Sequence, residues 1–253
     1  YKRREVIKLS ALGFASIALQ LNSISAFAQK ANGHLGRWSA ETKLNWDAFL
    51  ERLTQLAKSQ HELPWDQGLY TDQVRQLLLQ CNFPEVEKIK NAMNSYENRR
   101  PNWFESASLH YEQDFQISLF QFEKGEYIPH HDHPHMTGVL NVISGNLLAK
   151  NYNVEAQGSA SREIKKGDQT FEVKNCILRE VESEVLKAGD VGILTEEEGN
   201  IHSIMPNEFT QMVDVFTPAY KQNTNAQWYK VNEEEFYDEQ EHLFKAEYAS
   251  IRF

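Results

Sequence analysis

Four of the nine histidines in this chain lie within six residues, in the segment His130-His131-Asp132-His133-Pro134-His135. Neutral imidazole is the commonest protein ligand for first-row transition metals. Side chains alternate between the two faces of an extended strand, so the rings of His131 and His133 are expected on one face. A fifth histidine, His202, lies far downstream in Gly199-Asn200-Ile201-His202. These residues predict a mononuclear metal centre with His131, His133 and His202 as its ligands.

Two further histidines of the segment are not assigned as ligands. His130 should point to the opposite face of the strand, together with Asp132. His135 shares the face of the pair, but Pro134 perturbs the strand before it. The alternative interpretation is a histidine-rich surface loop that holds metal loosely or not at all.

The glycine spacing around the histidines indicates how they are positioned. Gly125 is followed by five residues and then His131-x-His133, which resembles the first motif of cupin barrels. Gly199-x-x-His202 resembles the second cupin motif. The glutamate that usually follows is missing, because Thr137 and Gly138 occupy the candidate positions. Three imidazoles without a carboxylate leave more coordination positions free, which suits an anionic ligand such as a thiolate together with oxygen.

The elements that carry these residues differ between the two halves of the chain. Apolar residues recur at three- and four-residue steps between about 40 and 100, which predicts helices. The members are Trp46, Phe49, Leu50, Leu53 and Leu56, then Val74, Leu77, Leu78 and Cys81, with another helix expected from Glu85 to Met93. The Arg99-Arg100-Pro101 stretch is typical of a linker.

Short runs of β-branched and aromatic residues follow the linker and predict strands. These runs are 115–122, 128–135, 139–143, 147–154, 191–194, 201–205 and 211–216. Ser144-Gly145-Asn146 suggests a hairpin turn. The polar region 155–190 suggests short strands joined by mobile loops, with turns at Gly158-Ser159-Ala160-Ser161 and Lys165-Lys166-Gly167-Asp168. The region after Glu233 suggests a solvated strand or helix. We therefore expect a mainly β fold, a jelly roll of the cupin type with six to eight strands, over residues 105–253. A helical N-terminal region would occupy 29–104.

Four separated motifs resemble the thiol dioxygenases, the family of 2-aminoethanethiol dioxygenase and the plant cysteine oxidases. Ile128-Pro129-His130-His131-Asp132-His133-Pro134-His135-Met136 is similar to the family's Ile-Pro-Leu-His-Asp-His-Pro-Gly-Met. The other motifs are Gly145 with Lys150-Asn151-Tyr152, then Gly199-Asn200-Ile201-His202, and Val213-Asp214-Val215 followed by Pro218-Ala219-Tyr220. The resemblance covers roughly residues 105–225.

This resemblance implies an iron(II) centre on His131, His133 and His202. It implies that O2 is added to a thiol, giving a sulfinic acid, and that the thiol is cysteamine-like or the N-terminal cysteine of a peptide. Asp214 matches an acidic residue near the iron that could hold a substrate amine or orient a histidine. Tyr220 matches a tyrosine that could position substrate or oxygen.

Two departures from the family pattern keep other functions open. His130 replaces a leucine and His135 replaces a glycine, which bears on the choice of substrate. The alternatives are a cupin enzyme of different chemistry, and a non-catalytic cupin that binds metal or another ligand in the periplasm.

The first 28 residues resemble a bacterial twin-arginine export signal. Arg3-Arg4 precedes Val6-Ile7-Lys8, an apolar run follows, and Ala26-Phe27-Ala28 has the small-x-small pattern of a cleavage site. The apolar run is too short and too interrupted for a confident membrane span. We expect cleavage after Ala28 and a periplasmic mature protein without stable membrane insertion.

Charge and cysteine content exclude some classes of function. The net charge is −10, and without residues 1–28, which sum to +3, it would be −13. Nucleic acid and anionic membrane surfaces are therefore poor partners. Two cysteines, Cys81 and Cys176, are too few for a disulfide framework, and whether they pair is left open.

Overall fold

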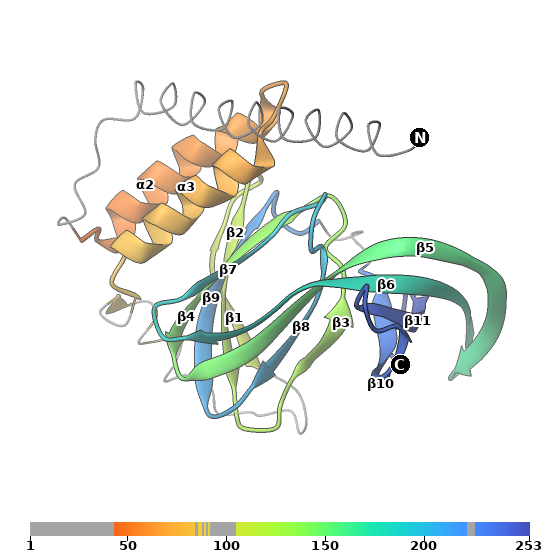
Figure 1. Ribbon diagram of the computed structural model, residues 1–253. Helices are drawn as coiled ribbons and strands as arrows, with labels where there is room; N and C mark the ends of the chain where they lie inside the picture. The colour runs from red at the N-terminus through yellow and green to blue at the C-terminus, as the bar shows by residue number, and fades with distance from the viewer. Residues whose placement is uncertain (1–42, 84–85, 88, 90, 92–104, 222–225) are drawn as a thin grey trace, which may run out of the picture. The chain divides into compact units, whose positions relative to one another are not determined.

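Two helices open the described part of the chain, which in this computed structural model comprises residues 43–83, 86, 87, 89, 91, 105–221 and 226–253 (Figure 1). Helix α2 spans Trp46–Ala57, the 3-10 turn η1 spans Lys58–His61, and helix α3 spans Gln67–Gln80. Asn45 and Asp66 cap the two α-helices, because their side-chain oxygens accept the N–H of Ala48 and Leu69. The prediction of helices is confirmed for these segments. The helix expected over 85–93 falls largely outside the described residues, and the expected export signal lies wholly outside them.

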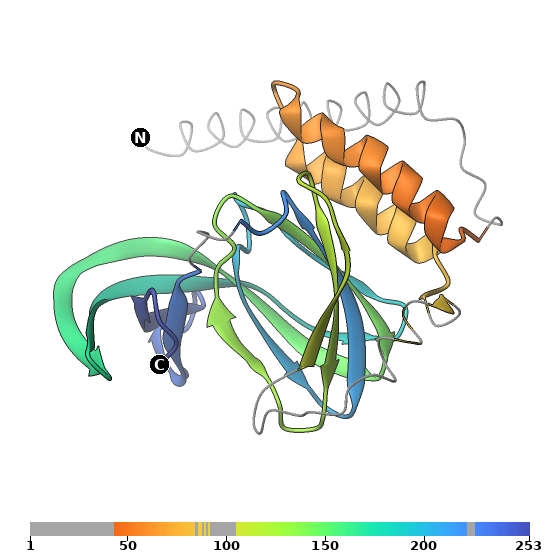
Figure 2. The same cartoon turned by 180° about the vertical axis from the view of Figure 1, so that it is seen from behind.

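Eleven strands follow among the described residues, arranged in two antiparallel sheets (Figures 1 and 2). The first sheet has the order β1-β2-β9-β4-β7, with β1 Glu105–Tyr111, β2 Gln116–Phe122, β9 Thr210–Thr217, β4 Thr137–Ser144 and β7 Val191–Leu194. The second closes on itself in the order β10-β11-β6-β5-β8-β3, with β10 Trp228–Asp238, β11 Leu243–Ala249, β6 Gln169–Lys187, β5 Asn146–Lys166, β8 Ile201–Pro206 and β3 Ile128–His131. The predicted fold class, a mainly β cupin jelly roll with N-terminal helices, is confirmed.

Side chains alternate between the two faces of β9, and each face packs into a different hydrophobic core. Val213 and Val215 pack with Phe49 and other helix residues, so the helices cover the outer face of the five-stranded sheet. Met212 points the other way, into a core shared with strands of the second sheet. Asp214 lies between the two valines in sequence and therefore faces the barrel interior.

The mobile loops expected within residues 155–190 are wrong, whereas strands and the turn expected at Lys165-Lys166-Gly167-Asp168 are present. Strands β5 and β6 form one long hairpin, whose turn at Gly167 and Asp168 joins the pair Lys166 and Gln169. The expected glycine-serine turn is a bulge within β5, because the register passes from Gln157 opposite Cys176 to Ser161 opposite Lys174. Figures 1 and 2 show this hairpin leaving the barrel and curving beside β10 and β11.

The hairpin expected at Ser144-Gly145-Asn146 is also wrong. Strand β4 pairs with β7 and β9, whereas β5 pairs with β6 and β8, so this segment carries the chain from one sheet to the other. Gly145 has a φ of 77°, and a Cβ there would lie 2.3 Å from the carbonyl oxygen of Phe209. Glycine is required for this crossing by conformation and by space.

The C-terminal region forms two paired strands, β10 and β11, which belong to the second sheet and join β3 to β6. Their aromatics Tyr229 and Phe244 are buried in a third cluster with Tyr152 and Cys176. Cys81 belongs to the cluster under the helices, and both cysteines are free thiols. The cysteines therefore serve as small core residues and do not pair.

Candidate metal centre

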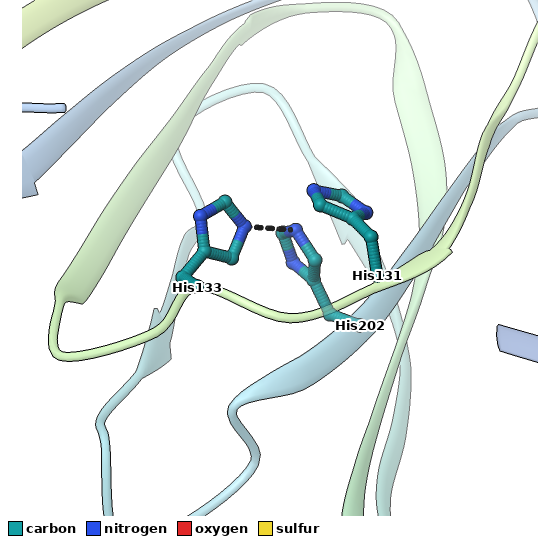
Figure 3. Close-up of side chains that lie close together, drawn as sticks. All are labelled: His131, His133 and His202. Atoms are coloured by element: carbon teal, nitrogen blue, oxygen red, sulfur yellow. Dashed lines mark hydrogen bonds between the residues drawn. The ribbon is translucent and has the colours of Figure 1, made fainter. Parts of the chain in front are cut away.

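Three imidazole rings converge in the barrel interior (Figure 3). His131 ends β3, His202 lies directly opposite it in β8, and His133 follows in the next loop. Their ring centroids are 4.7, 4.7 and 4.8 Å apart, and their ligating nitrogens all lie within 4.8 Å of one another. The three residues predicted from sequence are thus brought together, from positions up to 71 apart in the numbering.

One detail of the prediction is wrong, because no single strand carries both members of the His-x-His pair. Strand β3 ends at His131, and His133 occupies a loop. The ring of His133 turns into the site because Asn200 holds its backbone from both sides. The Asn200 side-chain oxygen accepts the His133 N–H at 2.9 Å, and its amide donates to the His133 carbonyl at 3.1 Å.

Asn200 holds the backbone beside the candidate site, and the sequence analysis did not single it out. Its side-chain amide also donates to the carbonyls of Thr195 at 3.1 Å and Met136 at 3.5 Å. One side chain thereby joins the loop of His133 to the loop before His202. The available signal was its place in the Gly-Asn-Ile-His motif, which was used only for the histidine.

Asp132, between two of the three histidines, faces away from the centre as strand alternation predicts. Its carboxylate accepts the backbone N–H of Gln227 at 2.6 Å and the hydroxyl of Tyr229 at 3.2 Å. Its own N–H donates to the Gln227 carbonyl at 3.1 Å. These contacts join the segment that carries His131 and His133 to β10 and to the residue just before it.

The two extra histidines of the cluster do not join the three. His130 Nε2 lies 2.9 Å from Glu233 Oε1, and the ring packs edge-on against Tyr152. His135 has 86% of its side chain exposed, a positive φ of 61°, and an imidazole nitrogen 2.7 Å from Glu196 Oε1. Both lie among carboxylates outside the triad.

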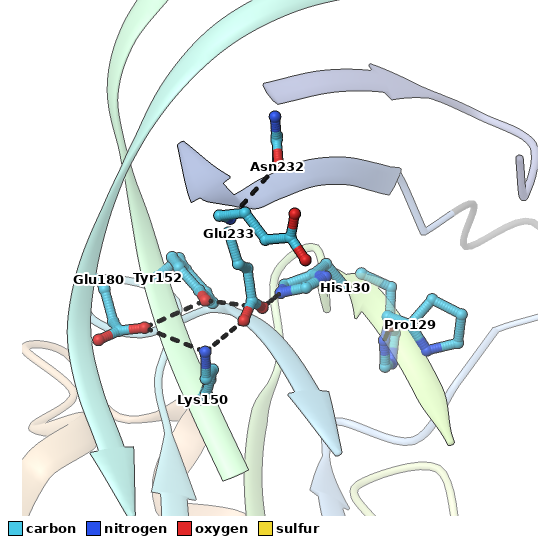
Figure 4. A network of polar contacts seen from close by, with 9 residues as sticks. Pro129, His130, Lys150, Tyr152, Glu180, Asn232 and Glu233 are labelled. Atoms are coloured by element: carbon cyan, nitrogen blue, oxygen red, sulfur yellow. Dashed lines mark hydrogen bonds and ion pairs between the residues drawn. The ribbon is translucent and has the colours of Figure 1, made fainter. Parts of the chain in front are cut away.

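Figure 4 shows that His130 belongs to a polar network between the barrel and β10. Glu233 contacts Lys150 and lies 3.2 Å from the hydroxyl of Tyr152, while Lys150 lies 3.7 Å from Glu180. The close contact with His130, followed by that with Lys150, lowers the pKa of Glu233 to about 2. This network stabilises the packing of β10 on β3 and β5.

Burial and hydrogen bonding prepare the three rings for a cation. Burial lowers the pKa of His131 to about 4 and the pKa values of His133 and His202 well below the ordinary range. All three are therefore neutral at pH 7, with lone pairs available. His131 Nδ1 donates to the Pro129 carbonyl at 2.9 Å, which leaves its Nε2 unprotonated. Tyr220 makes a hydrogen bond with His133 Nδ1 through its hydroxyl.

These donors fit a metal ion. The Nε2 atoms of His133 and His202 face each other at 2.9 Å, an arrangement that two lone pairs tolerate only with a proton or a cation between them. Within the described residues, no carboxylate or thiol belongs to this group of potential ligands. Three neutral nitrogen ligands are a donor set that iron, copper, nickel and zinc accept.

Asp214 lines a cavity that also reaches His202. It is buried, and its Oδ1 has no hydrogen-bond partner within the described structure. Burial raises the pKa of this carboxyl group to about 7. Burying a carboxylate oxygen without a hydrogen-bond partner costs free energy, which a hydrogen-bond donor or a cation bound at this oxygen would offset.

Comparison with family models identifies the family of the chain. A family model described as PCO_ADO, the thiol dioxygenase family, matches residues 72–250. The chain belongs to this family. The family match extends beyond the region 105–225 on which the sequence resemblance rested. Membership implies metal dependence, a thiol substrate and O2, so the protein is a thiol dioxygenase, an oxidoreductase, by family.

Solved structures similar to this thiol dioxygenase family member include one described as a cupin superfamily protein. A protein with a double-stranded β-helix domain from Klebsiella pneumoniae is 20% identical over 53% of this chain and 85% of its own, with a TM-score of 0.34. KdgF from Halomonas sp. is 15% identical over 51% and 91%, with a TM-score of 0.34. A cupin superfamily protein from Desulfitobacterium hafniense is 19% identical over 49% and 84%, with a TM-score of 0.31. No curated protein sequence matches the chain at a significant level.

Proposed function

We propose that this protein is an iron(II)-dependent dioxygenase that converts a cysteamine-like thiol, or the N-terminal cysteine of a peptide, to its sulfinic acid. The observation that carries the proposal is the convergence of three buried, neutral imidazoles without a carboxylate among the described ligating groups. Family membership supports the reaction class. Iron(II) bound at this site would supply the redox chemistry that adds both atoms of O2 to the thiol sulfur.

We assign His131, His133 and His202 as the metal ligands. His131 is kept in one tautomer by the Pro129 carbonyl, and the backbone of His133 is held by Asn200. Their burial excludes water and keeps protons from competing for the nitrogens. The protein thus supplies fixed nitrogen geometry and a dry site.

We assign two other residues to substrate and ligand positioning. Asp214 has a buried oxygen without a partner in the described structure, and this oxygen would accept an ammonium group of the substrate. Tyr220 would orient the ring of His133 through its hydrogen bond to Nδ1. Tyr220 also packs on Phe216, which stacks on the same histidine.

Oxygen consumption by iron-loaded protein tests the proposal. We expect thiol-dependent uptake of one O2 per thiol, and a product heavier by two oxygen atoms in the mass spectrum. The thiol panel should contain cysteamine and a peptide with N-terminal cysteine. The absence of uptake with both classes would count against the enzymatic function.

The alternative of a non-catalytic metal-binding cupin rested on His130 and His135. Both residues pair with glutamates outside the triad, so they add no further ligands to the three-histidine site. Tight binding of several ions per chain without oxygen consumption would still favour that alternative.

A further inference from the structure

Helix α3 makes a buried polar contact with the end of β9, outside the barrel. The hydroxyl of Tyr70 lies 2.6 Å from Thr217 Oγ1, and both side chains are buried. We propose that Tyr70 is a positioning residue of the metal centre, because by holding the end of β9 it fixes the loop that presents Tyr220 to His133. This inference rests on the proposed function, since it requires His133 as a metal ligand.

The end of β9 places neighbouring side chains on opposite faces of the sheet. Phe216 points inward, where its ring stacks on His133 with the two centroids 5.1 Å apart. Thr217 is the next residue, so its side chain points outward to the face that α3 covers. The contact with Tyr70 therefore holds the backbone one residue away from a ring that touches a proposed ligand.

The loop that begins at Thr217 is held again at Tyr220. The backbone N–H of Tyr220 donates to Gln116 Oε1 at 3.1 Å, and its hydroxyl makes a hydrogen bond with His133 Nδ1. Burial raises the pKa of Tyr70, so its hydroxyl keeps its proton at neutral pH. Without that hydroxyl, a buried threonine hydroxyl would lose its partner and one of the two ends of the loop would be released.

A second contact from the same helix face reaches the other loop beside the centre. Gln67 lies three residues before Tyr70 and therefore on the same face of α3. Its Oε1 accepts the backbone N–H of Glu196 at 3.1 Å. The carbonyl just before Glu196 accepts a hydrogen bond from Asn200, which holds the backbone of His133. The start of α3 thus contacts both loops that position this histidine.

A double-mutant cycle tests whether Tyr70 acts through Tyr220. The Kd for cobalt(II) is measured by competition with a chelator in the parent, Tyr70→Phe, Tyr220→Phe and the double variant. Tyr70→Phe should weaken cobalt binding about 3- to 10-fold in the parent. In the Tyr220→Phe background it should change the Kd less than about twofold, because the contact it supports is already gone. Urea unfolding of the metal-free proteins should show the same loss of stability from Tyr70→Phe in both backgrounds.

The matched control removes a buried hydroxyl from the same turn of the helix. Thr71 Oγ1 donates to the carbonyls of Gln67 and Gly68 within α3. Thr71→Val should lower stability and leave the Kd for cobalt(II) unchanged. Thr217→Val removes the hydrogen bond to Tyr70 from the barrel side and should weaken cobalt binding as Tyr70→Phe does, whereas Thr217→Ser keeps the hydroxyl and should retain the parent affinity.

Three outcomes would overturn the inference. They are equal weakening by Tyr70→Phe in both backgrounds, an equal effect of Thr71→Val, and parent-like cobalt binding in both Tyr70→Phe and Thr217→Val. Failure of the parent protein to bind cobalt(II) would instead overturn the proposed metal site.

Discussion

Burial decides the chemistry of the histidine triad at the scale of single residues. Exposed imidazoles are partly protonated near neutral pH, whereas burial lowers the pKa of His131 to about 4. The rings of His133 and His202 are held neutral for the same reason. Protons therefore do not compete with a metal ion for these nitrogens at physiological pH.

Replacing His202 tests the ligand assignment. His202→Ala should reduce bound iron from about one ion per chain to nearly none, because the two remaining nitrogens, of His131 and His133, hold iron weakly. Iron per chain, measured by elemental analysis after desalting, is the readout. His135→Ala is the control, since the exposed His135 lies with Glu196 outside the triad, and it should keep its iron. Unchanged iron in His202→Ala would refute the assignment.

The raised pKa of Asp214 predicts that the stability of the protein depends on pH. Its pKa is raised by burial from 3.8 to about 7, so the folded protein holds a proton that the unfolded chain releases between these values. The carboxyl group therefore reduces stability progressively as pH rises from about 4 through 7, by an amount on the order of 4 kcal/mol when fully ionised. Asp214→Asn removes this penalty and should stabilise the metal-free protein at pH 8 but hardly at pH 4.

Urea unfolding of the metal-free parent and Asp214→Asn proteins at several pH values measures this difference. The buried histidines contribute equally to both proteins and cancel in the comparison. A difference in unfolding free energy that stays constant with pH would show that Asp214 is already ionised in the folded state.

The sequence alone identified site residues whose side chains can bind metal or ionise. It did not identify a residue whose side chain holds the backbone of another. The triad and Asp214 were identified because imidazole spacing and motif order are visible in the chain. The hold of Asn200 on His133 was not, because it spans 67 residues and depends on how two loops meet. The position of an asparagine in the sequence does not predict such a contact.

At the scale of elements, the two loops beside the centre depend on Asn200. Asn200→Ala removes four hydrogen bonds and leaves backbone groups of His133 unsatisfied. We expect iron affinity to fall by about 10- to 100-fold and the free energy of unfolding to fall by about 1–3 kcal/mol. Competition with a chelator and urea unfolding give the two values.

Asn207→Ala is the matched control for this loop. Asn207 is exposed, and its side chain donates to Asn146 at 2.8 Å at a point remote from the triad in the strand register. We expect changes within about 0.5 kcal/mol and no loss of iron. Equal iron affinity in both variants would show that Asn200 does not position His133.

The crossing between the two sheets depends on Gly145. Gly145→Ala would place a Cβ 2.3 Å from a backbone oxygen, so we expect a loss of roughly 3 kcal/mol or more in urea unfolding. Gly167→Ala also has a positive φ, 62°, but no atom lies within 4 Å, so only about 1 kcal/mol should be lost. Similar losses in the two variants would contradict the crowding argument.

The element predictions failed where strand pairing is irregular. Turn-forming residues in 155–161 suggested a loop, but long-range pairing with β6 absorbs them as bulges. Ser144-Gly145-Asn146 was predicted to join two strands that pair with each other. Strands β4 and β5 do not pair with each other, because each pairs with strands that come later in the chain. Strands β2, β7, β8 and β9 were predicted correctly because their alternation or apolar runs are uninterrupted.

At the scale of the whole molecule, export remains a prediction from the first 28 residues. We propose a periplasmic protein whose mature form begins at Gln29, and N-terminal sequencing of protein from the periplasm of the native host would check it. Mutation of Arg3-Arg4 to Lys-Lys should leave the precursor inside the cell. A mature protein that begins upstream of Arg3 would contradict the proposal. No helix in the described part of the chain is long and apolar enough to span a membrane.

The hold of β10 on Asp132 has a consequence for biosynthesis. Asp132 and Tyr229 are 97 residues apart, yet their contact braces the segment that carries two of the three proposed ligands. A ribosome that has just made the His-x-His motif has not yet made the strand that fastens it. We therefore expect firm binding of the proposed metal ion only after translation of the last strands, and a chain stalled before Tyr229 should hold its metal loosely.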